Sequence, residues 1–251
     1  MPIARVLSGP DDSRFGRKVD GDARIYGTGE RPLKEIIVVG ASGFGRELAQ
    51  YVLEISDKQP EIRLKGFLDD NPKIRADGGR ILGAGVIGDT RAYAIQENDR
   101  FLISLGDPEL RQVLAERLAE RGAQFFTLTH PTAYVSSSAT LGAGCVIGPF
   151  ASVGSFARLG NHVLVNLYAT AGHDTQIGSH TVISPYGIAN GGSTVGERVF
   201  FGTHAVVTPN KKVGRQCQLA AGAVVYRDVP DFSLATGNPA KNFPLGQPND
   251  D

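Results

Sequence analysis

Two adjacent residues of this chain, His173 and Asp174, could carry out proton transfer. They occur in the stretch AGHDTQIGSH, where most neighbours are small, apolar or glycine. A histidine with a pKa near neutrality can take a proton from a reacting group, and an adjacent carboxylate can hold its tautomer and stabilise the charged ring. The alternative for a single histidine is a solvated polar turn with no chemistry. The surrounding elements must decide between the two.

A six-residue repeat surrounds this pair without interruption. From Val135 to Val225 every sixth residue is apolar, and the next residue is usually glycine or small and polar. The residue two positions before each is also small, with Lys211 as the misfit. A period of six suits neither a helix nor a plain strand, whereas hexapeptides are typical of a β-helix. We expect about five triangular coils of about 18 residues each, with the apolar side chains inside.

The segment before the repeats alternates between strand-like and helix-like patterns. EIIVVG, LKGFLDD, RFLISLG and AQFFTLT read as strands, and FGRELAQYVLEI and DPELRQVLAERLAERG read as helices, the second with a cap at Asp107. This alternation predicts a Rossmann-like α/β domain over residues 35–129, followed by a β-helix over residues 130–229. Residues 230–251 are expected to form a C-terminal cap and tail. Residues 1–34 are polar, and either form a flexible arm, with a short strand around ARIYG, or cap a neighbouring subunit.

A glycine-rich turn, GASGFG, joins the first expected strand to the first expected helix. Its glycines, Gly40, Gly43 and Gly45, do not match the G-x-G-x-x-G fingerprint, so nicotinamide binding is not favoured. A glycine turn ahead of a helix can still offer main-chain N–H groups to a phosphate. The turn is therefore a candidate phosphate site.

Composition and charge exclude several classes of protein. The 26 basic and 26 acidic residues leave no excess charge for nucleic acid, and no apolar run is long enough to span a membrane. The start of the chain lacks the apolar core of a signal peptide, which predicts a cytoplasmic protein. Cys145 and Cys217 would lie four coils apart, about 19 Å at the usual strand spacing, which is too far for a disulfide. Both cysteines are expected in the core.

The repeats, followed by RDVPDFSLATGNPAK, resemble the left-handed β-helix acyltransferases. The resemblance extends to the two-domain nucleotide-amino-sugar N-acetyltransferases of the bacillosamine and perosamine type and the related sialic acid O-acetyltransferases. It covers about residues 35 to 243 and is carried by VVGASGFGRE, GFLDD, HPTAYVSSSATLGAGCVIG, AGHDTQIGSHTVISP and GNPAK. It implies a Rossmann-like domain joined to a left-handed parallel β-helix, a homotrimer, acetyl-CoA as co-substrate, no metal, and a nucleotide-linked 4-amino-deoxysugar as acceptor.

The resemblance also implies roles for individual residues. It makes His173 the general base and Asp174 its partner, and it places Asn166 near the acceptor sugar. It assigns the thioester oxygen to the backbone amide of Gly191, and the pantetheine arm to Thr203 and Ala221.

For the nucleotide sugar, the resemblance implies binding by the turn at Gly43 and Phe44 and by Asp69 or Asp70. Family members often carry histidine where Phe44 stands. Phenylalanine cannot donate a hydrogen bond, so Phe44 either stacks on a base or sugar or packs in the domain; packing is the favoured reading.

Three other functions compete with this hypothesis. Sugar O-acetylation needs the same base, so the sequence does not separate an amine from a hydroxyl acceptor. A metal hydratase of the γ-type carbonic anhydrase class would use histidines such as His162 and His180, but the two histidines five residues apart that mark that class are missing. We expect His162 and His180 to be solvated turn residues. A non-catalytic binding or assembly protein on the same solenoid is the remaining alternative.

Overall fold

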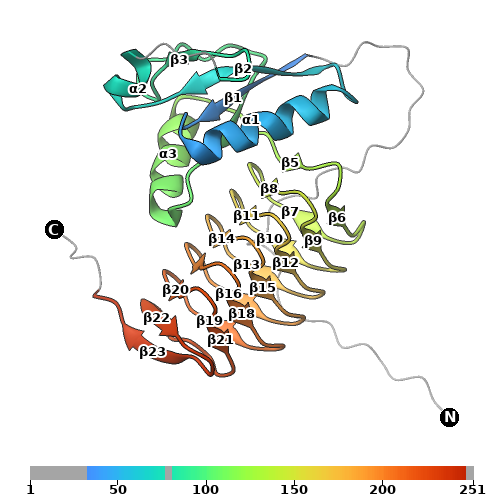
Figure 1. Ribbon diagram of the computed structural model, residues 1–251, viewed down its shortest axis with the longest axis vertical. Coiled ribbons are helices and arrows are strands. Elements are labelled where there is room, and N and C mark those ends of the chain that lie inside the picture. The colour runs from blue at the N-terminus through green and yellow to red at the C-terminus, as the bar shows by residue number, and fades with distance from the viewer. Residues whose placement is uncertain (1–32, 77–80, 247–251) are drawn as a thin grey trace.

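The computed structural model describes residues 33–76 and 81–246, in which a small α/β domain sits on a long stack of β-coils (Figure 1). The short strand considered around ARIYG lies outside these residues. None of the described helices is long and apolar enough to cross a membrane.

The α/β domain is a parallel four-stranded sheet with strand order β3-β2-β1-β4. Its elements in chain order are β1 Lys34–Val39, α1 Gly43–Ser56, β2 Ile62–Leu68, α2 Pro72–Ala76, β3 Val86–Gly88, β4 Asp99–Ile103 and α3 Pro108–Glu120. The central strand β1 is buried along its apolar run, as expected for a strand covered on both faces. The C-terminus of β1 leads directly into the glycine turn and α1. The turn therefore lies at the carboxyl ends of the sheet strands.

The prediction of a fourth sheet strand at AQFFTLT is wrong. Phe125 makes only an isolated bridge to Phe101, and the fourth strand is β3 instead. The end of the same run forms β5, Leu128–Thr129, which pairs with the β-helix strand β8. An apolar run indicates a buried strand without saying which sheet buries it.

Beyond the α/β domain the chain winds into coils whose two-residue strands form three parallel sheets. From β5 to β18 each strand pairs with the one eighteen residues further on; Thr170, for example, pairs with Ile188. The docked sheet contains β5, β8 Val146–Ile147, β11 Leu164–Val165, β14 Val182–Ile183, β17 Phe200–Phe201 and β20 Gln218–Leu219. The polar sheet contains β7 Thr140–Leu141, β10 Arg158–Leu159, β13 Gln176–Ile177, β16 Thr194–Val195 and β19 Lys212–Val213. The open sheet contains β6 Tyr134–Val135, β9 Ser152–Val153, β12 Thr170–Ala171, β15 Ile188–Ala189, β18 Val206–Val207 and β21 Val224–Val225.

The apolar residue of each six-residue repeat points into the interior of these coils. The second residue of each strand from β6 to β21 occupies the repeat's apolar position, and together these side chains form the core of the β-helix. Cys145 and Cys217 are buried and free in the same core, as predicted. Every sixth residue from Gly144 to Gly222 has a positive φ, which marks a left-handed residue at each corner.

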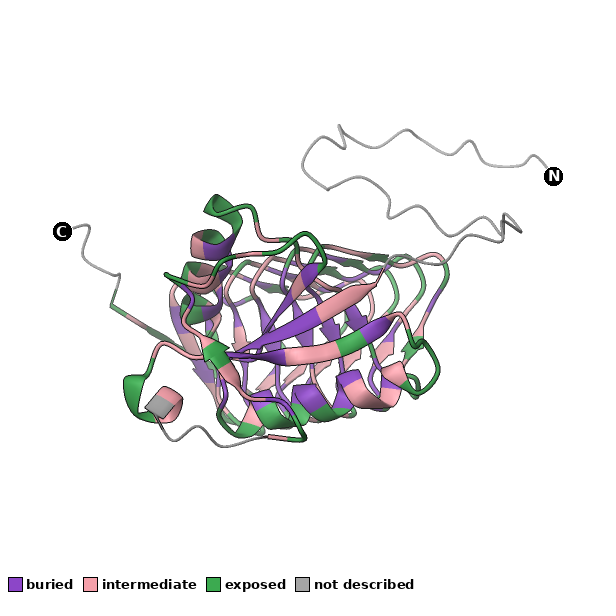
Figure 2. Ribbon diagram, turned by 90° about the horizontal axis from the view of Figure 1, so that it is seen from above, coloured by how far each residue is buried: buried purple, intermediate pink, exposed green. Residues whose placement is uncertain are grey.

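The docked sheet takes its name from helix α1, which covers its outer face. Leu48, Val52 and Ile55 of α1 belong to one apolar cluster with Val146 and Leu164 of the docked sheet. Seen from above, the α/β domain lies in front of the stacked coils (Figure 2). At the other end of the chain, β22 Ser233–Thr236 extends the docked sheet and pairs antiparallel with β23 Lys241–Pro244.

Candidate active site

His173 and Asp174 lie at the corner that joins β12 of the open sheet to β13 of the polar sheet. We call the turns between these two sheets the histidine corner. The imidazole Nδ1 of His173 is 2.8 Å from Asp174 Oδ2, and both side chains are exposed in the single chain. If Nδ1 carries the proton toward the carboxylate, Nε2 is left as a free acceptor. The adjacent residues thus have the geometry of a general base and its orienting acid.

Backbone geometry brings these two side chains together. Asp174 has φ of 57°, and its N–H donates to the Ser155 carbonyl of the preceding coil at 2.9 Å. The left-handed turn is one that aspartate tolerates better than most residues. The carbonyl of His173 accepts from Gly192 N–H at 2.9 Å in the following coil. The pair is therefore anchored to the coil on each side.

Gly191 occupies the position of His173 one coil later and makes room for its ring. A Cβ atom at residue 191 would stand 2.4 Å from His173 Nε2, which is closer than any real contact. The structure therefore places the backbone of Gly191 directly beside the free nitrogen of the histidine. The resemblance implies that the backbone amide of Gly191 faces the thioester oxygen. The structure adds a steric reason for glycine at that position.

Asn166, Thr203 and Ala221 lie at a different corner from His173. They occupy turns between the docked sheet and the open sheet, which we call the aromatic corner. Asn166 precedes β12 and His173 follows it, so the open sheet separates them. One chain therefore does not bring the acceptor and pantetheine residues together with the base.

The glycine turn of the α/β domain forms a third group. Gly43 begins α1 and is exposed, while Phe44 packs at the margin of the apolar cluster beneath α1, in agreement with the packing reading. Ser42 holds the N-cap position but makes no side-chain capping bond, so its hydroxyl does not occupy the first amides of α1. A hollow of about 200 Å³ beside the turn is lined by Gly40, Ser42, Asp69 and Asp70 among others.

The two acids of this hollow are already engaged. Asp69 accepts from Ala41 N–H at 2.9 Å and holds the turn in place. Asp70 accepts from Thr90 and forms an ion pair with Arg117 at 2.7 Å. Burial opposes ionisation of Asp70 and is the largest single influence, but the bonds from Thr90 and the charge of Arg117 outweigh it and lower the pKa. Sequence reasoning missed Thr90 and Arg117 because they are distant along the chain and carry no motif.

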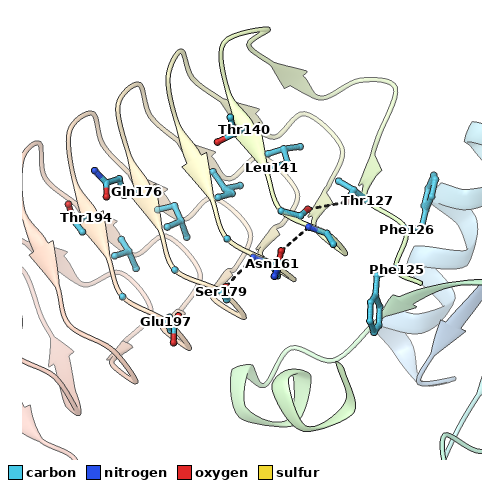
Figure 3. Close-up of a pocket in the computed structure, with 18 of the residues that line it drawn as sticks. Phe125, Phe126, Thr127, Thr140, Leu141, Asn161, Gln176, Ser179, Thr194 and Glu197 are labelled. Carbon is cyan, nitrogen blue, oxygen red and sulfur yellow. Dashed lines mark hydrogen bonds between the residues drawn. The ribbon is translucent and has the colours of Figure 1, made fainter. Parts of the chain in front are cut away.

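A larger groove of about 810 Å³ lies along the polar sheet, between it and the α/β domain (Figure 3). Phe125, Phe126 and Thr127 form one wall, and Asn161 and Ser179 are among the residues of the other. Neither His173 nor Asp174 lines it. The base is therefore on an open surface of the single chain, away from this hollow.

The expectation of solvated side chains is wrong for His162, and it does not hold in full for His180, which is half-buried with its Nδ1 shielded from solvent. His162 is 7% exposed and its ring lies edge-on to Phe125 at 4.5 Å. Burial, with repulsion from His180 and Arg111, lowers the pKa of His162 to about 3. The two histidine rings stack at 5.1 Å with planes 12° apart, so they lie parallel instead of converging on a common point. Within the described residues no group of three His, Cys, Asp or Glu side chains could hold a metal ion.

Comparisons with known proteins agree with this architecture. A family model described as the PglD N-terminal domain matches residues 35–118. UDP-N-acetylbacillosamine N-acetyltransferase of Bacillus subtilis is 34% identical over 115 residues, an alignment that spans 46% of this chain and about half, 51%, of that relative.

Two solved structures match over most of the chain. The acetyltransferase domain of PglB from Neisseria gonorrhoeae, in complex with acetyl coenzyme A, is 31% identical with a TM-score of 0.77, and the match covers 84% of this chain and all of that one. A mutant of perosamine N-acetyltransferase from Caulobacter crescentus, in complex with CoA and GDP-perosamine, is 30% identical with a TM-score of 0.72, covering 83% and 96%. The chain therefore belongs to the nucleotide-amino-sugar N-acetyltransferase family, with its α/β domain and left-handed β-helix.

Proposed function

We propose that this chain transfers the acetyl group of acetyl-CoA to the 4-amino group of a nucleotide-linked deoxysugar. Two observations support this: the match to the gonococcal domain that binds acetyl coenzyme A, and the match to the N-acetyltransferase that binds CoA and GDP-perosamine. The observation that carries the chemistry is the 2.8 Å contact between His173 Nδ1 and Asp174, which leaves Nε2 free to accept a proton.

In the proposed reaction the sugar nitrogen attacks the thioester carbon while His173 Nε2 takes one proton from that nitrogen. Asp174 stabilises the imidazolium that forms. The C–S bond of the tetrahedral intermediate then breaks to give the amide, and the proton on His173 leaves with the CoA sulfur as free thiol. No bond forms between the acetyl group and the protein. General-base assistance of this kind is worth roughly 10² to 10⁴ in rate.

The remaining residues receive supporting roles in this proposal. The main-chain N–H of Gly191 would face the developing oxyanion. Within the described chain this amide donates no other hydrogen bond. Asn166 would contact the sugar, and Thr203 and Ala221 would line the pantetheine arm. The glycine turn at Gly43 and Phe44, with Asp69 and Asp70, would hold the nucleotide sugar; Asp70 acts indirectly, because Thr90 and Arg117 already engage its carboxylate. Assembly as a homotrimer would bring these groups together.

The test is the release of free thiol from acetyl-CoA against a panel of nucleotide-linked 4-amino-sugars and matched hydroxyl sugars. We expect one amino-sugar to support turnover, His173→Ala to lower kcat at least 100-fold, and Asp174→Asn to lower it less. Acetyl-CoA binding, measured by calorimetry, should change little in both variants. Full activity in His173→Ala would refute the base assignment. Thiol release with hydroxyl sugars alone would replace the amine acceptor with an alcohol.

A further inference from the structure

The groove of about 810 Å³ along the polar sheet has no role in the proposed reaction. One of its walls is the link of residues 125–127, which leads from the α/β domain into the first coil (Figure 3). The other wall is the polar sheet, which turns outward Thr140, Gln176 and Thr194. A hollow of this size between two domains is large enough to take a ligand or a segment of chain.

The link that forms one wall of this groove has an unpaired strand edge. On one side it pairs with β4: Phe101 N–H donates to the Gln124 carbonyl at 2.9 Å, and Phe126 N–H donates to the Phe101 carbonyl at 3.0 Å. Neighbouring residues of an extended chain turn their N–H and C=O groups to opposite sides, so those of Phe125 and Thr127 face away from β4. Within the described chain these two N–H groups donate no hydrogen bond. An edge of this kind is a template for another strand.

The described chain begins beside the same groove. Its first residue is Leu33, and Lys34, at the start of β1, is one of the residues that line the groove. The family model that matches the α/β domain begins at residue 35. Residues 1–32 therefore lie outside the part of the domain that the family shares, and they join it at the groove.

One stretch of this leading segment has the sequence of a short strand. ARIYG, residues 23–27, places isoleucine and tyrosine, both frequent in strands, between the turn-like sequences DGD and GTGE. The eight steps from Tyr26 to Lys34 span up to roughly 26 Å when extended. The three coil spacings from β7 to β16 amount to roughly 14 Å. A segment tethered this closely has a local concentration on the order of 1 mM at the groove, so a weak contact is enough to hold it there.

We propose that residues 1–32 occupy this groove in their own chain, with ARIYG added as a strand to the edge formed by residues 125–127. The N–H groups of Phe125 and Thr127 then gain acceptors, and the apolar side chains of the added strand cover the aromatic wall. The acidic DGD sequence comes close to Lys34 and Arg100, two basic residues that line the groove. The segment acts as a strap that ties the α/β domain to the polar sheet, whereas α1 ties it to the docked sheet.

The first experiment identifies what lies over the polar sheet in the full chain. Gln176→Cys puts a thiol on the exposed wall of the groove, and the two native cysteines are buried, so a maleimide carrying benzophenone labels the new residue alone. On irradiation we expect a cross-link to residues 1–32, identified by mass spectrometry, in a product that keeps the 26.6 kDa mass of one chain on a denaturing gel. Gln50→Cys, which is also exposed but lies on α1, is the matched control and should give no such product. A product without a cross-link to residues 1–32, or one that joins two copies, would overturn the proposal.

Hydrogen exchange of the full chain tests the strand pairing. Peptides that contain Phe125 and Thr127 should exchange at least about tenfold more slowly in wild type than in the double variant Ile25→Asp, Tyr26→Asp, because the unpaired edge is open to solvent. Ser13→Asp, which places the same charge outside ARIYG, should exchange as wild type does. Fast exchange at this edge in wild type would show that no strand pairs with it. Slow exchange that persists in the double variant would show that a ligand or another protein occupies the edge, and either result refutes the strap.

Discussion

His162 shows how a single residue can be read wrongly from its position in a repeat. It occupies the same left-handed turn position as the exposed Tyr168 and Asp174, and nothing in the hexapeptide distinguishes it. Its burial comes from Phe125 and from the guanidinium of Arg111, which donates to the His162 carbonyl at 2.8 Å. Both partners belong to the α/β domain. The environment of this histidine is therefore set by residues that lie far away in the chain.

The buried, neutral state of His162 should make stability depend on pH. Its pKa is about 3 in the folded chain against an ordinary value of 6.5, so the unfolded chain alone binds a proton between these values. Stability should be full above pH 6.5 and fall as pH drops through that value, by roughly 1 to 2 kcal/mol at pH 5. Denaturant unfolding at several pH values measures this. His162→Phe should make the loss of stability toward pH 5 smaller, although His180, whose pKa burial also lowers to about 4, keeps part of it. Parallel curves for wild type and His162→Phe would contradict the assignment.

At the scale of elements, the two longer helices begin in different ways. Asp107 caps α3, accepting from the N–H groups of Glu109 and Leu110, both at 2.9 Å. Ser42 stands at the same position of α1 and makes no such bond. The difference fits the expected roles, because α3 is a supporting helix whereas α1 follows a turn that is a candidate phosphate site.

Replacing the two cap residues should therefore have unequal effects. Asp107→Ala should lower the free energy of unfolding by about 1 kcal/mol, because two amides lose their acceptor. Ser42→Ala should leave it nearly unchanged. Chemical denaturation of both variants, with Asp107→Asn as a conservative control that retains most of the stability, measures the difference. Equal losses in the two alanine variants would show that the caps are equivalent.

On the scale of the whole molecule, a few polar contacts join the α/β domain to the β-helix. Arg111 of α3 is fully buried and donates to the carbonyls of Ile103, Leu105 and His162. Burial lowers its pKa to about 10, so it remains charged at neutral pH. On α1, Glu54 Oε2 lies 2.8 Å from Nε2 of His130 in the first coil. These contacts fix the α/β domain against the coils.

Arg111→Met should make the α/β domain and the β-helix unfold at different temperatures. It leaves the carbonyl oxygens of Ile103, Leu105 and His162 without the guanidinium that satisfies them, and we expect a loss of about 3 kcal/mol. Calorimetry should show the melting of the α/β domain moving away from that of the β-helix. Arg46→Met, which changes an exposed arginine of α1, is the matched control. A loss below about 1 kcal/mol would mean that apolar packing alone holds the domains together.

The sequence by itself determined the β-helix, because each hexapeptide repeats one local pattern of inward apolar and small corner residues. It also determined α1, α3 and the cap at Asp107, which depend on residues within a few positions of each other. The adjacency of His173 and Asp174 is likewise local, so the sequence alone predicts the pair whose side chains meet at 2.8 Å.

Only the tertiary structure decided which surface each element meets. The sheet that receives β5, the burial of His162 and the engagement of Asp70 by Arg117 all depend on partners distant in sequence. So does the separation of His173 from Asn166 across the open sheet. Local periodicity fixes the shape of a coil, but the sides of that coil differ only through what packs against them.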